Sequence, residues 1–255
     1  MTVNYFNLNK FKKIINIGFF TSVGGLSKGN YSSLNCSKSS KDKKITINKN
    51  INIALQKLDI SHKKLKLINQ IHSNKVICVN NNNYNKKMSG DGLITSERKI
   101  ALGVLTADCA PIFIFDVKQS TICCLHAGWK GALSNIIKIA IKKMKNKKID
   151  TKNMVAIVGP CLNKKNFEVN KNFKLNFLKK NKLYIKFFRQ KNKYKDIFDL
   201  RGLINYQLRE MGVKNIYNIN RDTYKNSHIF FSHRRSVHQK NKDTGRMINI
   251  ISFKD

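Results

Sequence analysis

Two segments of the chain place a chemically reactive side chain directly after an apolar run. The run Ala101–Leu105 has the composition of a buried strand, and a polar triplet that ends at Asp108 separates it from Cys109. A later run, Thr121–Leu125, ends on His126. We therefore expect both Cys109 and His126 to sit where a strand gives way to a loop, which is where α/β proteins place their chemistry.

A third candidate lies upstream of these two residues. Leu65 and Leu67 alternate with lysines, which indicates a short strand, and we expect His72 at its end. Two imidazoles and one thiolate that leave a fourth position open are typical of a catalytic zinc site. Spacing alone leaves the plainer alternative open, because a strand-end histidine is often a surface or packing residue and a lone cysteine often a small buried apolar group.

The same side chains also suit two other chemistries. Cys109 could be the nucleophile of a cysteine hydrolase with His126 or His72 as its base, and bound metal would distinguish the two schemes. A His₂Cys set suits copper as well. A multicopper oxidase also needs a cluster held by many histidines, and the chain has six in all.

Several motifs resemble, in order, those of the family variously called laccase-domain proteins, polyphenol oxidases or peptidoglycan editing factors. They are QIHSNKV, GDGLITSERKIALGVLTADCAPI, HAGWKGAL, VGPCLNKKNFEV, IFDLR and FFSHRR…TGR, after an opening GFFTSVGGLSKGNYSSLN. The resemblance runs from about Gly18 to Arg246. It implies that His72, Cys109 and His126 bind the metal.

The resemblance also implies an activity, because members of the family are described as purine nucleoside phosphorylases with adenosine deaminase activity. We expect phosphorolysis of adenosine, inosine and methylthioadenosine to the free base and the sugar 1-phosphate. Zinc is the expected metal and copper the alternative. A cysteine-dependent, amidase-like editing of a peptidoglycan precursor is the alternative function, followed by a copper polyphenol oxidase and a basic nucleic-acid-binding protein.

Hydrolytic deamination needs a group that carries protons. Asp108 is adjacent to Cys109 in sequence, and Glu168 in the NFEV motif is the second candidate. We expect one of these carboxylates to be catalytic.

Phosphate needs cationic partners. Arg234, Arg235 and Arg246 carry planar guanidinium groups that can bind phosphate in a bidentate manner. The family usually has an arginine after the FFT segment, where this chain has Ser22, and Lys28 is a basic neighbour that could take its place. His233 stands where a tyrosine is usual in the family.

The apolar periodicity predicts three helices. One carries Ile47, Ile51, Ala54, Leu55 and Leu58 on one face, and another begins just past His126 and carries a stripe from Leu133 to Met144. Free N–H groups at the start of this second helix could hold an anion. The third begins at an Asp199 N-cap and ends at Gly212. Further strands are predicted at 14–20, 76–79, 112–115, 154–158, 183–188, 194–198, 214–219, 229–232 and 247–253.

Strands and helices interleave without strict βαβ alternation, which predicts a mixed α+β fold. The family resemblance implies a layered α/β/β/α sandwich with mixed sheets. The chain has two prolines and no linker-like stretch, so residues 1–255 are expected to form a single domain.

The formal net charge is +36, from 50 Lys and Arg against 14 Asp and Glu. The basic residues form no stripe and no nucleic-acid-binding module, so we interpret the excess as compositional drift typical of an AT-rich genome. Purine nucleoside and phosphate are the expected partners, with no specific nucleic acid and no membrane. The six cysteines lack a disulfide-like spacing and no secretory signal precedes them, which favours a reducing cytoplasm.

Overall fold

The computed structural model describes residues 3–255 and contains two mixed β-sheets. Along the five-stranded sheet the strands follow the order β1 (Tyr5–Phe6), β2 (Ile15–Phe20), β14 (Met247–Phe253), β6 (Ile100–Thr106) and β3 (Lys64–Lys66). Along the six-stranded sheet the order is β13 (Asn215–Asn218), β9 (Met154–Val158), β7 (Ala110–Asp116), β8 (Ile122–Ala127), β5 (Gly92–Thr95) and β4 (Val76–Val79).

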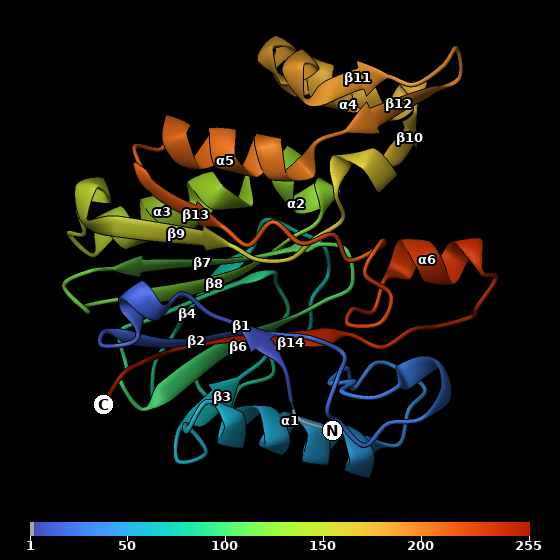
Figure 1. Ribbon diagram of the computed structural model, residues 1–255. Helices are drawn as coiled ribbons and strands as arrows, with labels where there is room; N and C mark the ends of the chain where they lie inside the picture. Colours follow the sequence, from blue (N-terminus) through green and yellow to red (C-terminus); the bar gives the residue numbers. More distant parts are fainter. Residues whose placement is uncertain (1–2) are drawn as a thin grey trace.

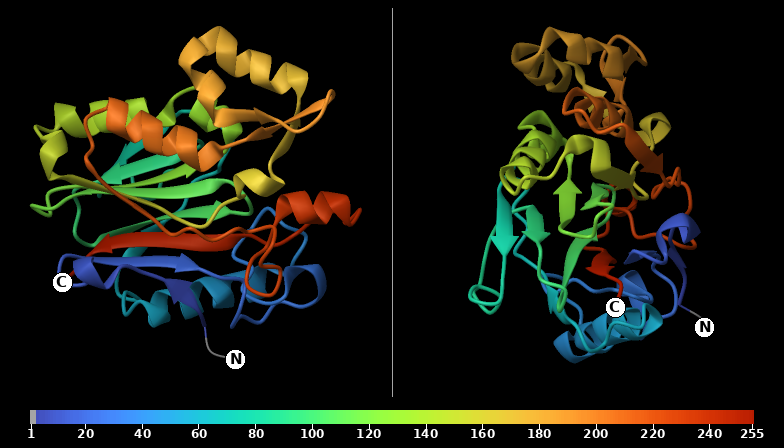
Figure 2. Two further views of the ribbon diagram at one scale, coloured as in Figure 1. Left: turned by 45° about the horizontal axis from the view of Figure 1, so that its top comes forward. Right: turned by 90° about the vertical axis from the view of Figure 1, so that its left-hand side faces the viewer.

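The two sheets pack face to face and helices cover their outer faces (Figures 1 and 2). Phe19 of β2 stacks on Phe113 of β7 with ring centroids 4.3 Å apart, inside the apolar layer between the sheets. Helix α1 (Lys44–Lys57) covers the five-stranded sheet, and α2 (Trp129–Leu133), α3 (Ile136–Asn146) and α5 (Leu200–Glu210) cover the other. The expected α/β/β/α architecture is therefore confirmed.

The helix predicted around Ile51 is confirmed as α1, whose apolar stripe is buried against the sheet. The helix predicted after His126 is wrong as a continuous element. It ends at Leu133 and restarts at Ile136, because Asn135 adopts a left-handed conformation (φ 61°) and its side chain accepts the N–H of Lys138 as an N-cap. The long amphipathic helix thus starts away from His126, and no long helix offers its N-terminus there.

A small three-stranded sheet stands beside the sandwich, at the end where α5 begins (Figure 1). Its order is β10 (Glu168–Asn170), β12 (Lys195–Phe198) and β11 (Phe188–Gln190), with α4 (Lys171–Lys180) against it. The strand predicted at 183–188 is wrong, because Lys182–Phe187 forms a 3₁₀ helix (η5). Tyr184 and Phe187 are three residues apart and both buried, which matches the period of a 3₁₀ helix.

The strand predicted at 229–232 is also wrong. Phe230 and Phe231 are buried in a loop, and a short apolar run does not distinguish such a loop from a strand. Ser232 then caps a helix, α6 (His233–His238), by accepting the N–H of Arg235. This helix lies between the strands predicted at 229–232 and 247–253, where the sequence analysis predicted no element.

The remaining predicted strands are confirmed within a residue or two at their ends, apart from the strand that was expected to end at His72, which is β3 and ends at Lys66. Asp199 caps α5 by accepting the N–H of Gly202 at 2.8 Å, and Gly212 follows the helix at φ 86°, as predicted. Short 3₁₀ turns complete the chain at Asn9–Phe11, Gly29–Tyr31, Thr151–Asn153 and Lys164–Asn166. Among the described residues, no helix has the length and apolar character that a membrane crossing requires.

Candidate metal centre and its two cavities

His72, Cys109 and His126 lie together at one edge of the sandwich. Their potential ligand atoms all fall within 4.8 Å of one another. Cys109 lies in the short connection between β6 and β7, and His126 lies inside β8, one residue before its end. His72 does not sit at a strand end as expected, because β3 ends at Lys66; it lies in a later loop with φ 56°.

The pairing of β7 with β8 brings the cysteine to the histidine. Ala110 pairs with Ala127 in antiparallel register, so Cys109 lies across from Gly128. A Cβ atom on Gly128 would lie 2.8 Å from Cys109 Sγ and 3.4 Å from His72 Cδ2. Gly128 has an extended backbone (φ −77°, ψ 179°) that any residue could adopt. The missing side chain, rather than the backbone conformation, is therefore what this position requires.

Asp91 is a fully buried carboxylate that links two of the three ligands. Its Oδ1 lies 2.8 Å from His126 Nδ1 and accepts the His72 backbone N–H at 3.0 Å, and its Oδ2 accepts the Ser73 hydroxyl at 2.7 Å. An ionised carboxylate only accepts, so it fixes the proton of His126 on Nδ1 and leaves Nε2 available as a ligand. The sequence analysis missed Asp91, although it immediately precedes β5, the strand paired with the strand of His126.

The charges in this group are strongly coupled. Burial raises the pKa of Cys109, but the charges and hydrogen bonds of His126 and His72 outweigh burial and bring it to about 6. Burial lowers the pKa of His126, and the Cys109 thiolate and Asp91 more than compensate, raising it to about 9. In the metal-free protein, Cys109 and His126 therefore form a thiolate–imidazolium pair near neutral pH.

The donor set fits a metal ion. A thiolate and two imidazoles are ligands that both zinc and copper accept, and one of the imidazoles is already oriented by a buried carboxylate. Because Gly128 has no side chain, there is room for the Cys109 sulfur beside the histidines. These residues would hold the ion, and they do not by themselves select between the two metals.

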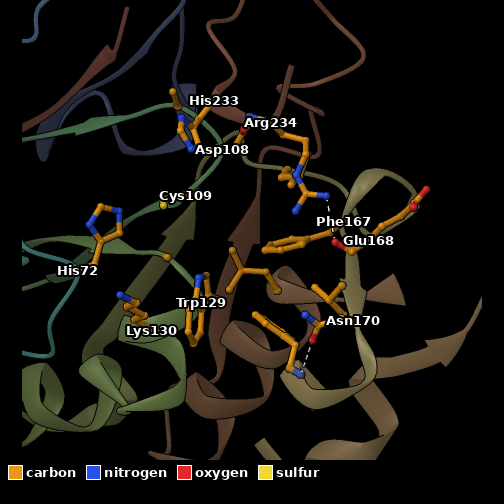
Figure 3. Close-up of a pocket in the computed structure, with 16 residues that line it drawn as sticks. His72, Asp108, Cys109, Trp129, Lys130, Phe167, Glu168, Asn170, His233 and Arg234 are labelled. Carbon is orange, nitrogen blue, oxygen red and sulfur yellow. Dashed lines mark hydrogen bonds between the residues drawn. The ribbon is translucent and has the colours of Figure 1, made fainter. Parts of the chain in front are cut away.

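Two cavities meet at this group. The first, which we call the aromatic cavity, has a volume of about 560 Å³ and reaches toward α2 and the three-stranded sheet. Trp129, Phe167 and Phe173 line it, and the ring centroids of Trp129 and Phe173 are 5.0 Å apart. Figure 3 shows His72 and Cys109 at one side of this cavity, with Lys130, Asn170 and Arg234 around it.

The second cavity, about 680 Å³, which we call the basic cavity, reaches toward the layer of α1. Its walls come from the loop 36–39, the segment 67–70 and Arg246. His72, Ala107, Cys109 and His233 line both cavities. His126 lines only the basic cavity, whereas Gly128 and Trp129 line only the aromatic one. The metal-ligand group thus forms the boundary between two spaces.

Asp108, predicted as a proton carrier, lines the aromatic cavity and is mostly buried. Its Oδ1 accepts the Thr223 hydroxyl at 2.6 Å. Its Oδ2 accepts the Ser232 hydroxyl at 3.0 Å and the Arg234 N–H at 2.6 Å. Both oxygens therefore also hold the loop that leads into α6.

Glu168, the second predicted proton carrier, also lines the aromatic cavity. Its carboxylate pairs with Lys191 and with Lys195, the latter at 3.3 Å, and the pKa of the carboxyl is lowered chiefly by the hydrogen bond from Lys191. Figure 3 shows this carboxylate pointing away from Cys109.

The predicted phosphate ligands occupy different places. Arg234 lines the aromatic cavity, where its guanidinium lies over the Phe167 ring and donates to the Glu168 carbonyl at 3.0 Å. Arg246 lines the basic cavity. Arg235 donates to the carbonyls of three loop residues, Thr223, Tyr224 and Phe230. Its guanidinium is therefore engaged in hydrogen bonds within the protein. Lys28 is exposed and lines neither cavity.

Comparison with known proteins identifies relatives along most of the chain. A model of the family described as multi-copper polyphenol oxidoreductase laccase matches residues 16–254. A Rickettsia prowazekii protein named purine nucleoside phosphorylase is 33% identical over 191 residues, covering 74% of this chain and 78% of the relative. A Campylobacter jejuni protein of the same name is 34% identical, covering 75% and 78%. The purine nucleoside phosphorylase YfiH of Shigella flexneri is 27% identical, covering 91% and 90%.

Solved structures show the same fold. A Neisseria meningitidis protein superposes with a TM-score of 0.86 at 26% identity, and the match covers 100% of both chains. YlmD from Geobacillus stearothermophilus superposes with a TM-score of 0.89 at 23% identity, over 100% of this chain and 97% of that one. The second likeness carries information on the fold alone.

Proposed function

Because the chain belongs to the multi-copper polyphenol oxidoreductase laccase family, and its relatives are named purine nucleoside phosphorylases, we propose that it is a metal-dependent purine nucleoside phosphorylase. The observation that carries the proposal is the position of His72 and Cys109, two members of the His72/Cys109/His126 group, on the wall of the aromatic cavity. Potential metal ligands and three aromatic rings thus face the same space.

The aromatic cavity suits a purine. Base–aromatic stacking contributes about 1–3 kcal/mol per base, and Trp129, Phe167 and Phe173 present such rings beside polar side chains that can bind ring nitrogens. We propose adenosine, inosine and methylthioadenosine as substrates, with phosphate as the second substrate. The products are the free base and the sugar 1-phosphate.

We propose adenosine deamination as a second activity of the same site. A zinc ion held by the three ligands supplies Lewis-acid chemistry that activates water at neutral pH. The protein must bind the base in a fixed orientation and move a proton. Asp108 is the carboxylate that we assign to proton transfer, because it lies next to Cys109 whereas Glu168 is paired with two lysines.

Zinc is the metal that we propose, with copper as the alternative, since the donor set accepts either ion. We place the reaction in the cytoplasm. The six cysteines are free in the described structure, as a reducing compartment would keep them.

A cysteine hydrolase is the second candidate, because Cys109 and His126 form a thiolate–imidazolium pair in the metal-free protein. An amidase-like editing of a cell-wall precursor would use this pair directly. The two candidates make opposite demands on metal, since a ligated thiolate is not a free nucleophile.

The deciding experiment incubates metal-free and zinc-loaded protein with adenosine, with and without phosphate, and separates the products. Adenine that requires both zinc and phosphate supports the phosphorylase, and inosine formed without phosphate supports the deaminase. Cys109→Ala should abolish metal binding and turnover together. Adenosine turnover by the metal-free protein with Cys109 intact would favour the hydrolase. The absence of any nucleoside turnover at full zinc occupancy would refute the purine proposal.

A further inference from the structure

The basic cavity has no role in the binding of a purine base, yet it opens onto the same metal-ligand group. Among residues 3–255, none of the aromatic rings of the first cavity and no aspartate or glutamate lines it. His126 contacts this cavity alone, and Cys109 faces both. A ligand here would reach the metal-ligand group from the basic cavity rather than from the aromatic one.

Two cationic side chains line the basic cavity. Lys38 makes no ion pair or side-chain hydrogen bond with any residue in the range 3–255. Arg246 donates from Nη1 alone, to the carbonyls of Thr244 and Gly245, and its nearest carboxylate oxygen, on Asp243, is 3.9 Å away. Within the described chain the rest of its guanidinium has no acceptor. Arg246 thus has one ion pair, with Asp243, and Lys38 has none among the described residues. Two cationic side chains on a wall without a described carboxylate favour an anionic ligand.

A buried asparagine holds these two segments together. Asn35 is fully buried, and its Oδ1 accepts both the Ser37 N–H at 3.1 Å and the Arg246 N–H at 3.0 Å. The Cys36 N–H in turn donates to the Arg246 carbonyl at 3.1 Å. The loop of Lys38 and the segment of Arg246, just before β14, are therefore fixed side by side before a ligand binds. Such preorganisation reduces the cost of binding.

We propose that the basic cavity is the binding site of the phosphate co-substrate, held by Lys38 and Arg246, while the purine base occupies the aromatic cavity. This assignment rests on the proposed phosphorylase function. The sugar then spans the boundary between the cavities, beside the metal-ligand group.

The two-sided arrangement matches the reaction. A phosphate oxygen forms a bond to C1′ of the sugar on one face, and the C1′–N9 bond breaks on the other, its electron pair leaving with the purine. The proton of the hydrogen phosphate ion is transferred to the departing base, so that charge and atoms balance. Attack and departure on opposite faces require the phosphate and the base to lie on opposite sides of the sugar.

Steady-state kinetics of zinc-loaded variants test the proposal. Arg246→Gln and Lys38→Gln should each raise the KM for inorganic phosphate by about 10-fold to 100-fold, because each removes a charge-assisted hydrogen bond. The KM for adenosine, the phosphate-independent formation of inosine and the zinc content should not change. Arg246→Lys should restore part of the phosphate affinity.

Two matched controls lose the same charge elsewhere. Lys41→Gln changes an exposed lysine of the same loop that does not line the cavity, and Arg209→Gln changes an exposed arginine in the last turn of α5. Both should keep the KM for phosphate of the parent protein. An unchanged KM in Arg246→Gln and Lys38→Gln would overturn the proposal. So would a rise confined to Arg234→Gln and Lys130→Gln, which would move phosphate to the aromatic cavity.

Titration of the zinc-loaded protein with inorganic phosphate in a calorimeter separates the two proposals. If no nucleoside is turned over, weaker phosphate binding in Arg246→Gln and Lys38→Gln still supports the anion site while the phosphorylase proposal fails. If phosphate binds these variants as it binds the parent, the anion site is refuted whether or not nucleosides react.

Discussion

Asp91 Oδ1 lies 2.8 Å from Nδ1 of His126 and also accepts the backbone N–H of His72. One buried carboxylate therefore orients the ring of one proposed metal ligand and the loop that carries another. The two ligands lie on segments that are far apart in the chain, and their relative position depends on this single side chain.

Asp91→Asn should weaken zinc binding by about 10-fold to 100-fold, the usual effect of losing the partner of a ligating histidine. The amide can donate to His126 and so no longer fixes its proton on Nδ1. Competition with a chromophoric chelator measures the affinity. Asp116→Asn is the control, because Asp116 is equally buried but binds only groups of its own turn, among them the Ser120 hydroxyl. Equal loss of zinc affinity in both variants would contradict the specific role of Asp91.

The same carboxylate should make the protein sensitive to acid. Burial raises the pKa of Asp91, but hydrogen bonds from His126 and Ser73 outweigh burial and lower it to about 2. Since the folded pKa lies below the unfolded value of about 3.9, its stabilisation is present above that value and is lost as the pH falls toward 2. The shift corresponds to about 2–3 kcal/mol. Urea unfolding of metal-free protein between pH 6 and 2 should show a smaller acid-dependent loss in Asp91→Asn than in the parent, and parallel curves would speak against it.

Cys109 should react as a thiolate at unusually low pH in the metal-free protein, because His126 and His72 bring its pKa to about 6. Iodoacetamide labelling in a Cys78→Ser background, which removes the exposed thiol, should give a midpoint near that value. Saturating zinc should slow the labelling at least about tenfold, because the metal competes for the sulfur. A midpoint near 8.5, the ordinary value of a free thiol, would show that the pair does not form.

The sequence predicted which side chains come together better than it predicted their surroundings. His72, Cys109 and His126 were proposed as one group, and the structure brings them within 4.8 Å. Long strands such as β14 were also predicted, because seven consecutive buried residues leave a clear apolar signal. The position of His72 was predicted wrongly. It was expected at a strand end, but it lies in a loop after the end of β3 at Lys66, and no local sequence pattern indicates where that strand ends.

What the sequence missed depends on contacts between distant segments. Asp91 becomes a partner of His126 only through the pairing of β5 with β8, and Asp108 meets Thr223 and Ser232 only in the folded chain. The break between α2 and α3 arises from one residue, Asn135, whose capping overrides a continuous apolar stripe. The 3₁₀ helix η5 is only 6 residues long, and so short an apolar segment does not distinguish a helix from a strand.

Trp129→Leu should weaken nucleoside binding while leaving phosphate binding unchanged. Leucine keeps apolar volume in the wall but removes the ring face on which a base can stack, a loss of about 1–3 kcal/mol or roughly 5-fold to 150-fold in the KM for adenosine. Phe188→Leu is the control, because Phe188 belongs to the same aromatic cluster, 6.2 Å from Phe173 between ring centroids, and does not line the cavity. If both variants keep the parental KM for adenosine, the base does not stack on Trp129.

Gly128→Ala should disrupt the metal centre with one added methyl group. The new Cβ would lie 2.8 Å from Cys109 Sγ and 3.4 Å from His72 Cδ2, so the sulfur must move away from the histidines. Because the backbone of Gly128 is extended, alanine adds no conformational strain, and the thermal midpoint of the metal-free protein should change little. Zinc content after dialysis should fall well below one ion per chain. Gly131→Ala is the control: its Cβ would meet the Ser73 carbonyl at 3.2 Å and no ligand side chain, so zinc should be retained. Full zinc occupancy in Gly128→Ala would show that the site tolerates the methyl group and that the absence of a side chain at this position serves some other purpose.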